Sequence, residues 1–289
     1  ALEGCTVLDM GCGTGRDSYL CSKLVGEKGR VIGVDMTRAQ LDVAERHRDA
    51  QAKKFGYATS NVTFHEGLME DLGVMGIEDA SVDVVISNCV INLAPDKHKV
   101  FSEIFRVLKP GGELYFSDVF VDRRLAKEFM NDPVLVGECL AGAMYTHDFR
   151  RMMLTFGIAD YRIMKQEAMA IHNPIIEQQL APARFFSTTI RAFKLDNLED
   201  RCEDYGQVAT YRGTIENHPN AFELDDHHQF TAHKPMLVCG NTAAMLNDTR
   251  FGQHFDVTGD RSRHFGVMEE CAEGSATTSV AQADDGACC

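Results

Sequence analysis

The sequence predicts an α/β fold in which a doubly wound, mostly parallel sheet is followed by a smaller mixed α+β domain and a flexible tail. Apolar runs typical of strands alternate with helix-like segments through the first half of the chain, which is the order expected of such a sheet. Three glycines at alternate positions, Gly11, Gly13 and Gly15, directly follow the first apolar run. The run at 82–87 is nearly all apolar, as expected of a parallel strand covered on both faces.

Each expected element up to residue 120 follows from local signals. Short apolar runs indicate the strands, and apolar side chains three or four residues apart indicate the helices. Gly26 and Gly29 end the first helix, and Pro95 opens the third. The strands are expected at 5–10, 30–34, 61–64, 82–87 and 113–120, the helices at 15–24, 37–55 and from about 96, and a turn at 109–112.

The sequence changes character beyond about residue 146. A helix is expected at 148–156, and alternating runs at 183–194, 206–215 and 222–232 indicate strands of a small domain. From residue 269 onward the only large apolar residue is Val280, which is typical of disorder because little apolar surface can be buried. We therefore expect a Rossmann-like domain over 1–147, a smaller mixed α+β domain over 148–240, and a segment over 241–289 with a short helix and a largely disordered, cysteine-containing tail.

Composition limits the partners of the chain. Its formal net charge of −14 over 289 residues argues against nucleic acid and against an anionic membrane surface, because both repel an acidic protein. No long apolar window and no signal peptide is visible, so we expect a cytoplasmic protein, taken to be a monomer. The ten cysteines are too few for a disulfide scaffold of this size and favour metal or redox chemistry.

The glycine loop indicates a nucleotide-like cofactor, because glycines let the backbone approach a ligand and helix N-terminal amides then face it. The dinucleotide fingerprint does not fit, since its third glycine comes one residue early at Gly15. Asp9 lies two residues before Gly11, and Asp35 ends the next apolar run, where an acid can accept both ribose hydroxyls. This pattern resembles motif I of the class I S-adenosylmethionine (SAM) methyltransferases and implies their Rossmann-like fold and SAM as donor. NAD binding, or a structural turn in an unrelated α/β domain, is the alternative.

Four further residues are candidates for contacts with the donor. Met36, directly after Asp35, either packs on the adenine face or fills the core. Gly67 and Glu70 follow the third strand, where this fold contacts adenine. Asn88 ends the fourth strand and either hydrogen-bonds the amino-acid part of the donor or caps the strand. The expected donor site is Asp9, Gly11, Gly13, Gly15, Asp35, Met36, Gly67, Glu70 and Asn88.

Two cysteines indicate the acceptor. Ligands of a doubly wound sheet bind outside the carboxyl ends of its strands, so Cys89, just past the fourth strand, faces the reactive end of the donor. Cys139 follows fifty residues later, with glycine or alanine at 137 and at 141–143. Such small residues permit a close approach of the backbone or a crowded pocket.

The chain resembles the arsenite SAM methyltransferases of the eukaryotic and algal type. The resemblance covers nearly the whole chain and is strongest over residues 8–17, 87–93, 112–118 and 137–140. It implies a catalytic site in which Cys89 and Cys139 bind trivalent arsenic as thiolates, supported by residues 148–240. It also implies arsenic detoxification with a thiol reductant, either glutathione or a thioredoxin-like protein.

The resemblance further implies residues that would precede this chain. Ala1 lies four residues before the first strand, and two more family cysteines would come before it. We therefore expect a chain that lacks its natural N-terminus and binds methylated trivalent arsenic better than it turns over arsenite. Cys288 and Cys289 match a terminal pair common in the family, which either handles arsenic and electrons or is a flexible pair of exposed thiols.

Thiolate ligation also suits the chemistry of arsenic. Trivalent arsenic is soft and thiophilic, and coordination favours the thiolate form of cysteine. The arsenic lone pair then attacks the sulfonium methyl in line, and no general base is needed because the nucleophile carries no proton. Holding the two atoms in attack geometry is worth roughly 7–11 kcal/mol of barrier. Paired cysteines can reduce oxidised arsenic by forming a disulfide.

Two other functions stay open at this point. The same fold methylates small organic acceptors, such as a quinone precursor or a sterol, and a thiol-based arsenic-binding protein would need no turnover. Cys5 and Cys12 lie in the first strand and the glycine loop and are interpreted as structural. His227 and His228, with acids at 225 and 226, match no strong metal motif, so a solvated polar turn is expected there.

Overall fold

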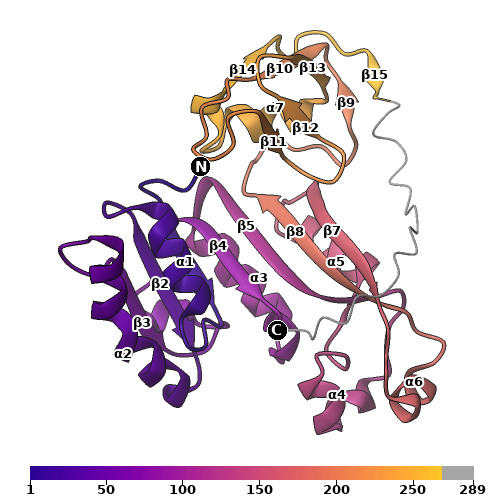
Figure 1. Cartoon of the computed structure of the whole chain (residues 1–289). Coiled ribbons are helices and arrows are strands. Elements are labelled where there is room, and N and C mark those ends of the chain that lie inside the picture. Colours follow the sequence, from indigo (N-terminus) through magenta and orange to yellow (C-terminus); the bar gives the residue numbers. More distant parts are fainter. Residues whose placement is uncertain (269–289) are drawn as a thin grey trace.

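The computed structural model describes residues 1–268, so the tail expected to be disordered and the terminal cysteine pair lie outside the described residues. An eight-stranded sheet organises most of the chain, with the strand order β3-β2-β1-β4-β5-β8-β7 and with β6 beside β5 (Figure 1). Its strands are β1 (Thr6–Met10), β2 (Arg30–Asp35), β3 (Val62–Glu66), β4 (Val82–Asn88), β5 (Leu108–Val121), β6 (Met144–Tyr145), β7 (Tyr161–Met169) and β8 (Phe185–Phe193).

The first five strands pair in parallel, and the short β6 pairs in parallel with β5, which confirms the predicted doubly wound class. β1 pairs in parallel with β2 and β4, β2 with β3, and β4 with β5. The strand order changes direction between β1 and β4, and the carboxyl ends of strands at such a point border the ligand in sheets of this kind. The glycine loop follows β1 and Cys89 follows β4, so both lie at this edge.

β7 and β8 extend this sheet by antiparallel pairing. β8 pairs with β5 from Glu113 to Val121 and with β7 on its other side. Both strands belong to the region expected after residue 147, so the main sheet continues across the expected boundary. The long pairing covers the backbone edge that β5 would otherwise expose to solvent.

The predicted helices form close to their expected positions. α3 begins after Asp96, whose carboxylate accepts a hydrogen bond from Lys99 N–H at 3.1 Å. It buries Val100, Ile104 and Val107, as its apolar spacing predicts. The helices are α1 (Arg16–Val25), α2 (Arg38–Phe55), α3 (Lys97–Val107), α4 (Pro133–Gly137), α5 (Thr146–Thr155) and α6 (Pro174–Leu180), with 3₁₀ segments at Leu72–Met75, Ile91–Leu93, Lys127–Asn131 and Gly252–His254.

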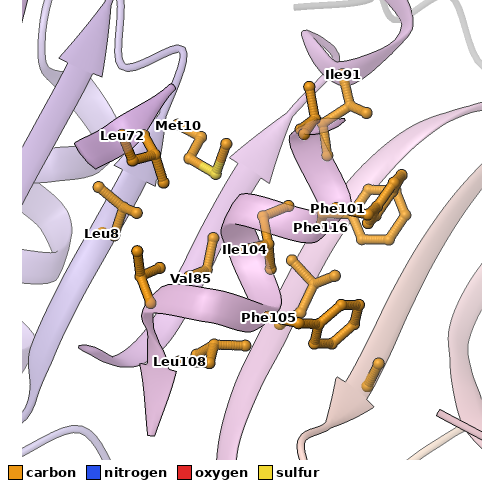
Figure 2. Packing of buried hydrophobic residues seen from close by; sticks show 14 of the residues in the cluster. Leu8, Met10, Leu72, Val85, Ile91, Phe101, Ile104, Phe105, Leu108 and Phe116 are labelled. Atoms are coloured by element: carbon orange, nitrogen blue, oxygen red, sulfur yellow. The ribbon is translucent and has the colours of Figure 1, made fainter. Parts of the chain in front are cut away.

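Apolar side chains from the central strands and from α3 form the main core (Figure 2). Leu8, Val85, Ile104 and Phe116 are fully buried there. Burial of a side chain of this size is worth about 1.5–3 kcal/mol relative to leaving it in water. The packed core therefore holds β1, β4 and β5 in a defined arrangement, and the site is built on the ends of these strands.

The segment 109–112, expected as a turn, forms part of β5 instead. Gly111 N–H donates to Lys194 O at 2.7 Å and Lys194 N–H donates to Gly112 O at 2.9 Å, so backbone pairing continues past the end of β8. Gly111 has a φ of +75°, and a Cβ at this position would lie 2.5 Å from Asp248 O. A glycine is therefore needed where the C-terminal part of the chain packs on the start of β5.

Residues from about 203 form a small unit with its own hydrophobic core. β10 lies between β13 and β14, and the run predicted at 222–232 is a hairpin of β11 and β12. This unit lies at the end of β5 opposite to α4 (Figure 1). Its elements are β9 (Glu203–Asp204), β10 (Gln207–Tyr211), β11 (Ala221–Glu223), β12 (Gln229–Thr231), β13 (Pro235–Val238), α7 (Gly240–Asn247), β14 (Phe255–Thr258) and β15 (Gly266–Val267).

Among residues 1–268, no helix is long and apolar enough to cross a membrane.

Candidate functional site

The glycine loop has the backbone conformation that the sequence predicts. Gly11, Gly13 and Gly15 have φ values of +73°, +53° and +82°, which residues other than glycine rarely adopt. A Cβ on Gly11 would lie 2.4 Å from Val90 Cγ2, so the loop packs directly on the residue that follows Cys89. A Cβ on Gly13 would meet nothing within 4 Å, so the backbone there is open to a ligand.

The two acids predicted to accompany the loop occupy different places. Asp35 lies beside the loop, where its carboxylate accepts hydrogen bonds from Gly13 N–H at 2.9 Å and from Thr37 N–H at 2.8 Å. Asp9 lies beneath the loop with 4% of its surface exposed and accepts a hydrogen bond from Ser18 Oγ at 2.6 Å. Burial raises the pKa of Asp9 to about 7. Asp35 is thus placed to meet a ligand, whereas Asp9 supports the loop from below.

The other candidate donor residues surround the same edge of the sheet. Met36 is 68% exposed, so the alternative that it fills the core is excluded. Gly67 N–H donates to Asp35 O at 3.0 Å, which places the end of β3 beside the end of β2. Glu70 is half-buried, and Asn88 is exposed at the end of β4. An open glycine backbone, a carboxylate at a strand end and an exposed thioether together fit a nucleoside such as SAM.

The structure brings Cys89 and Cys139 together. Cys89 follows β4 and its N–H donates to Ser117 O at 2.8 Å, whereas Cys139 follows α4. Cys139 Sγ donates a hydrogen bond to Cys89 O at 3.4 Å. Both residues have a φ of +57°, a conformation that costs about 1–3 kcal/mol for a non-glycine residue and persists only where its surroundings enforce it.

Three other cysteines lie at or around the glycine loop, where Cys12 and Cys21 are buried and Cys5 is half-buried. Burial raises the pKa of Cys21 to about 12, and burial likewise raises the pKa of Cys12 and of Cys5. A buried thiol with a raised pKa is a poor ligand and nucleophile, because only the thiolate reacts. The raised thiol pKa of Cys5 and Cys12 agrees with their interpretation from the sequence as structural residues.

Sequence reasoning missed the acid that lies under the Cys89 loop. Asp118 of β5 is buried and accepts hydrogen bonds from Asn92 N–H at 3.0 Å and Val119 N–H at 2.8 Å. Burial raises its pKa to about 6. Lys97 Nζ donates to Asn92 O at 3.1 Å and covers the same loop. Asp118 lies inside β5, which continues to Val121, so it lacks the position at the end of an apolar run that marked Asp35 in the sequence.

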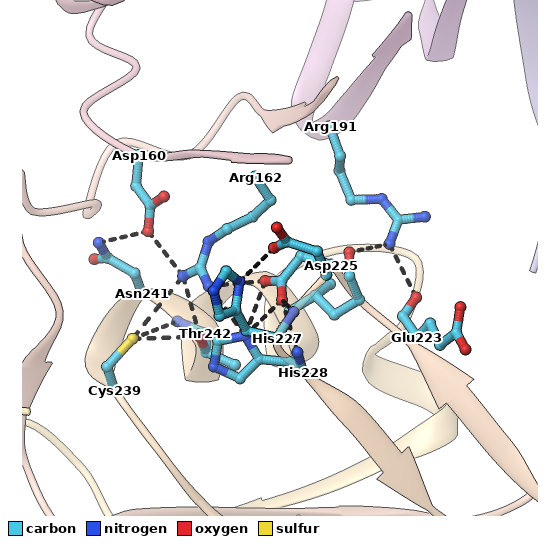
Figure 3. A network of polar contacts seen from close by, with 12 residues as sticks. Asp160, Arg162, Arg191, Glu223, Asp225, His227, His228, Cys239, Asn241 and Thr242 are labelled. Carbon is cyan, nitrogen blue, oxygen red and sulfur yellow. Dashed lines mark hydrogen bonds and ion pairs between the residues drawn. The ribbon is translucent and has the colours of Figure 1, made fainter. Parts of the chain in front are cut away.

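The turn at 224–228 is solvated only in part: Asp226 and His227 are exposed, as expected, whereas Asp225 belongs to a buried ion-pair network (Figure 3). Asp225 is buried, pairs with Arg162 of β7 at 2.9 Å and accepts a hydrogen bond from His228 Nδ1 at 2.7 Å. Asp225, Asp226 and His227 do lie within metal-binding distance of one another. Arg162 and His228 already engage the Asp225 carboxylate, so the cluster is better explained as a link between the main sheet and the C-terminal unit.

Comparison with known proteins gives consistent matches over both parts of the chain. A methyltransferase domain family matches residues 1–169, and an arsenite methyltransferase C-terminal domain family matches residues 204–284. An arsenite methyltransferase of Aquipseudomonas alcaligenes is 52% identical over 94% of this chain and 78% of that protein. The human arsenite methyltransferase is 43% identical over 88% of this chain and 67% of that protein.

A solved structure is similar over nearly its whole length. The crystal structure of an arsenic (III) S-adenosylmethionine methyltransferase from Chlamydomonas reinhardtii superposes with a TM-score of 0.89 at 54% sequence identity. The match covers 93% of this chain and 90% of that one. Main sheet and C-terminal unit are therefore both common to the two proteins.

Proposed function

The chain belongs to the arsenite methyltransferase family, and from this membership we propose which of its residues carry out the reaction. It is a SAM-dependent methyltransferase that acts on arsenite. The observation that carries the residue assignment is the hydrogen bond from Cys139 Sγ to Cys89 O at the end of the sheet where the glycine loop lies. The thiol of Cys139 thus meets the backbone of Cys89, fifty residues earlier in the sequence.

The donor is held by the residues around the glycine loop. SAM supplies a methyl group on a positively charged sulfonium sulfur. We assign Asp35 to the ribose hydroxyls, because its carboxylate lies at a strand end and has lone pairs beyond those used by Gly13 and Thr37. Met36 packs on the adenine, and Asp9 supports the loop through Ser18. The proposed donor site is Asp9, Gly11, Gly13, Gly15, Asp35, Met36, Gly67, Glu70 and Asn88.

The acceptor is held by Cys89 and Cys139. When arsenite binds, Cys139 gives up its hydrogen bond to Cys89 O, and each thiol proton leaves with an arsenic hydroxide as water. The two sulfurs then fix the arsenic while its lone pair attacks the methyl group. Because the lone pair carries no proton, the cysteines act by holding the nucleophile in attack geometry. The packing of Gly11 on Val90 fixes the distance between donor loop and thiols.

The remaining parts of the proposal rest on the sequence. Attack of the arsenic lone pair on the methyl group leaves arsenic pentavalent, and two thiols that form a disulfide supply the two electrons that return it to the trivalent state. A thiol reductant, either glutathione or a thioredoxin-like protein, then reduces this disulfide. Residues 148–240 support the arsenic site, and the protein is a monomer of the cytoplasm.

The test compares arsenite affinity and methyl transfer in the wild type, Cys89→Ser and Cys139→Ser. Cys5→Ser is the matched control, because Cys5 is also half-buried but lies before β1, at the end of that strand opposite to the glycine loop. We expect both site variants to lose arsenite affinity by at least tenfold and to keep SAM affinity, and the control to keep both. Wild-type arsenite affinity in either site variant would refute the assignment, and methylation of a quinone precursor or sterol instead of arsenite would favour an organic acceptor.

A further inference from the structure

The two cysteine loops meet at a second point, three residues beyond each cysteine. Gly142 is buried, and a Cβ on it would lie 2.0 Å from Asn92 O and 2.9 Å from the Asn92 carbonyl carbon. Both atoms belong to the backbone, so no side-chain rotation relieves the contact. The φ of Gly142 lies outside the left-handed region, so space and not backbone conformation requires a glycine here.

Asn92 provides a fixed surface for this contact. Its side chain is 1% exposed and its Nδ2 donates to Val119 O at 2.7 Å. Its N–H donates to Asp118 at 3.0 Å, and its carbonyl oxygen accepts from Lys97 Nζ at 3.1 Å. Two hydrogen bonds therefore hold Asn92 on β5, and a third joins it to the start of α3.

The Cys139 loop is held just as firmly on its other side. Leu140 N–H and Ala141 N–H both donate to Leu135 O at 3.0 Å. Leu140 and Ala141 are buried in the cluster that also includes Leu135. A displacement at Gly142 is therefore passed along a short, well-packed segment to Cys139.

We propose that the contact of Gly142 with Asn92 O sets the separation of the Cys89 and Cys139 sulfurs, and that these two residues position the cysteines for arsenic. The inference rests on the proposed function of Cys89 and Cys139. One arsenic atom bound by two sulfurs accepts only a narrow range of sulfur separations, and a misplacement of about 1 Å can cost about 100-fold in a catalytic site. Gly142 and Asn92 touch neither reactant and act through the cysteines.

The chain contains a matched control for this idea. Gly137 lies in the same segment, two residues before Cys139, and a Cβ on it would meet nothing within 4 Å. Gly137→Ala therefore adds the same methyl group to the same segment without a contact. A comparison of Gly142→Ala with Gly137→Ala isolates the effect of the approach to Asn92 O.

The experiment measures arsenite affinity, SAM affinity and the rate of alkylation of the two thiols by iodoacetamide. We expect Gly142→Ala to bind arsenite 10- to 100-fold more weakly, to keep SAM affinity within twofold and to keep both thiols reactive. Gly137→Ala should match the wild type in all three. If Gly142→Ala does not fold, Asn92→Ala, which loses the bond to Val119 O, is expected to weaken arsenite binding with SAM affinity unchanged.

The outcomes separate this inference from the proposed function. If Cys89→Ser and Cys139→Ser lose arsenite affinity but Gly142→Ala binds arsenite as the wild type does, the positioning role is refuted and the cysteine ligands stand. If the two serine variants keep their affinity, the proposed function itself fails. A parallel loss of arsenite and SAM affinity in Gly142→Ala would show a general structural role and would also overturn the inference.

Discussion

The thiol of Cys139 donates a hydrogen bond to the carbonyl oxygen of Cys89 at 3.4 Å, and both residues have the same left-handed φ of +57°. A cysteine in this conformation is strained relative to glycine. Strain of this kind is found at functional sites, where it orients a side chain that would otherwise point elsewhere. The strain at these two positions thus has a stability cost that the following variants can measure.

Replacement of either cysteine by glycine should stabilise the fold relative to replacement by alanine. At a left-handed position glycine avoids a penalty of about 1–2 kcal/mol. In urea unfolding we expect the free energy of unfolding to be about 1 kcal/mol higher for Cys89→Gly than for Cys89→Ala, and likewise for the two variants at Cys139. Cys5 does not have a positive φ, so at this position the alanine variant should be more stable than the glycine variant. Equal stability of glycine and alanine variants at 89 and 139 would contradict the strained geometry.

The packing of Gly11 on Val90 predicts a specific effect of Gly11→Ala. A Cβ there would lie 2.4 Å from Val90 Cγ2, in addition to the cost of its φ of +73°. Gly26 has a φ of +75° with nothing within 4 Å of its Cβ position, so Gly26→Ala shows the backbone cost alone. Calorimetric titration should show that Gly11→Ala lowers the affinity for SAM by at least tenfold and that Gly26→Ala leaves it unchanged. Equal SAM affinities in the two variants would mean that the contact with Val90 does not shape the donor loop.

The buried carboxyl of Asp9 should make stability depend on pH. Burial raises its pKa to about 7 in the folded state, above the ordinary value of about 3.9. The folded state therefore binds more protons between these values, and its stability falls as pH rises from about 4 to 7. Asp9→Asn keeps an acceptor for Ser18 and removes the buried charge, so at pH 8 it should be more stable by on the order of 2–4 kcal/mol. Urea midpoints between pH 4.5 and 8 measure this, and parallel profiles of the two proteins would refute it.

Glu113 should be essential for joining the C-terminal unit to the sheet. It is fully buried and pairs with Arg191 at 2.6 Å and with Arg250. Burial alone would raise its pKa, but the charges of the two arginines hold the pKa below its usual range. Glu113→Ala leaves both arginines without this partner and should cost about 3–5 kcal/mol of unfolding free energy.

An exposed ion pair provides the comparison for Glu113. Asp256 pairs with Arg212 on the surface, and exposed pairs contribute about 0–1 kcal/mol. Chemical denaturation should therefore show a much smaller loss of unfolding free energy for Asp256→Ala than for Glu113→Ala. A loss of similar size for Glu113→Ala would show that the buried pair does not hold the two parts together.

Local patterns in the sequence account for the first half of the fold. Apolar runs and glycine punctuation predicted β1 to β5 and the helices between them, because these signals reflect burial and backbone freedom of neighbouring residues. The same reasoning indicated the glycine loop, Asp35 and Cys89 as candidates, since each lies at the end of a strand or directly after it. It named no strand at β7, and it did not assign β8 to the main sheet, because an alternating run shows that a strand has one buried face but not which sheet it joins.

The sequence by itself determined the doubly wound class and the backbone conformation of the glycine loop, and it indicated Cys89 and Cys139 as candidate arsenic ligands. Only the tertiary structure decided that the Cys139 thiol reaches Cys89 O, that Asp118 holds the loop that follows Cys89 through Asn92 N–H, and that Gly142 packs on Asn92 O. The physical reason is that these contacts join residues 26 to 50 positions apart in the chain. Periodicity and spacing report on the neighbourhood of each residue along the chain, whereas such contacts depend on how complete elements pack.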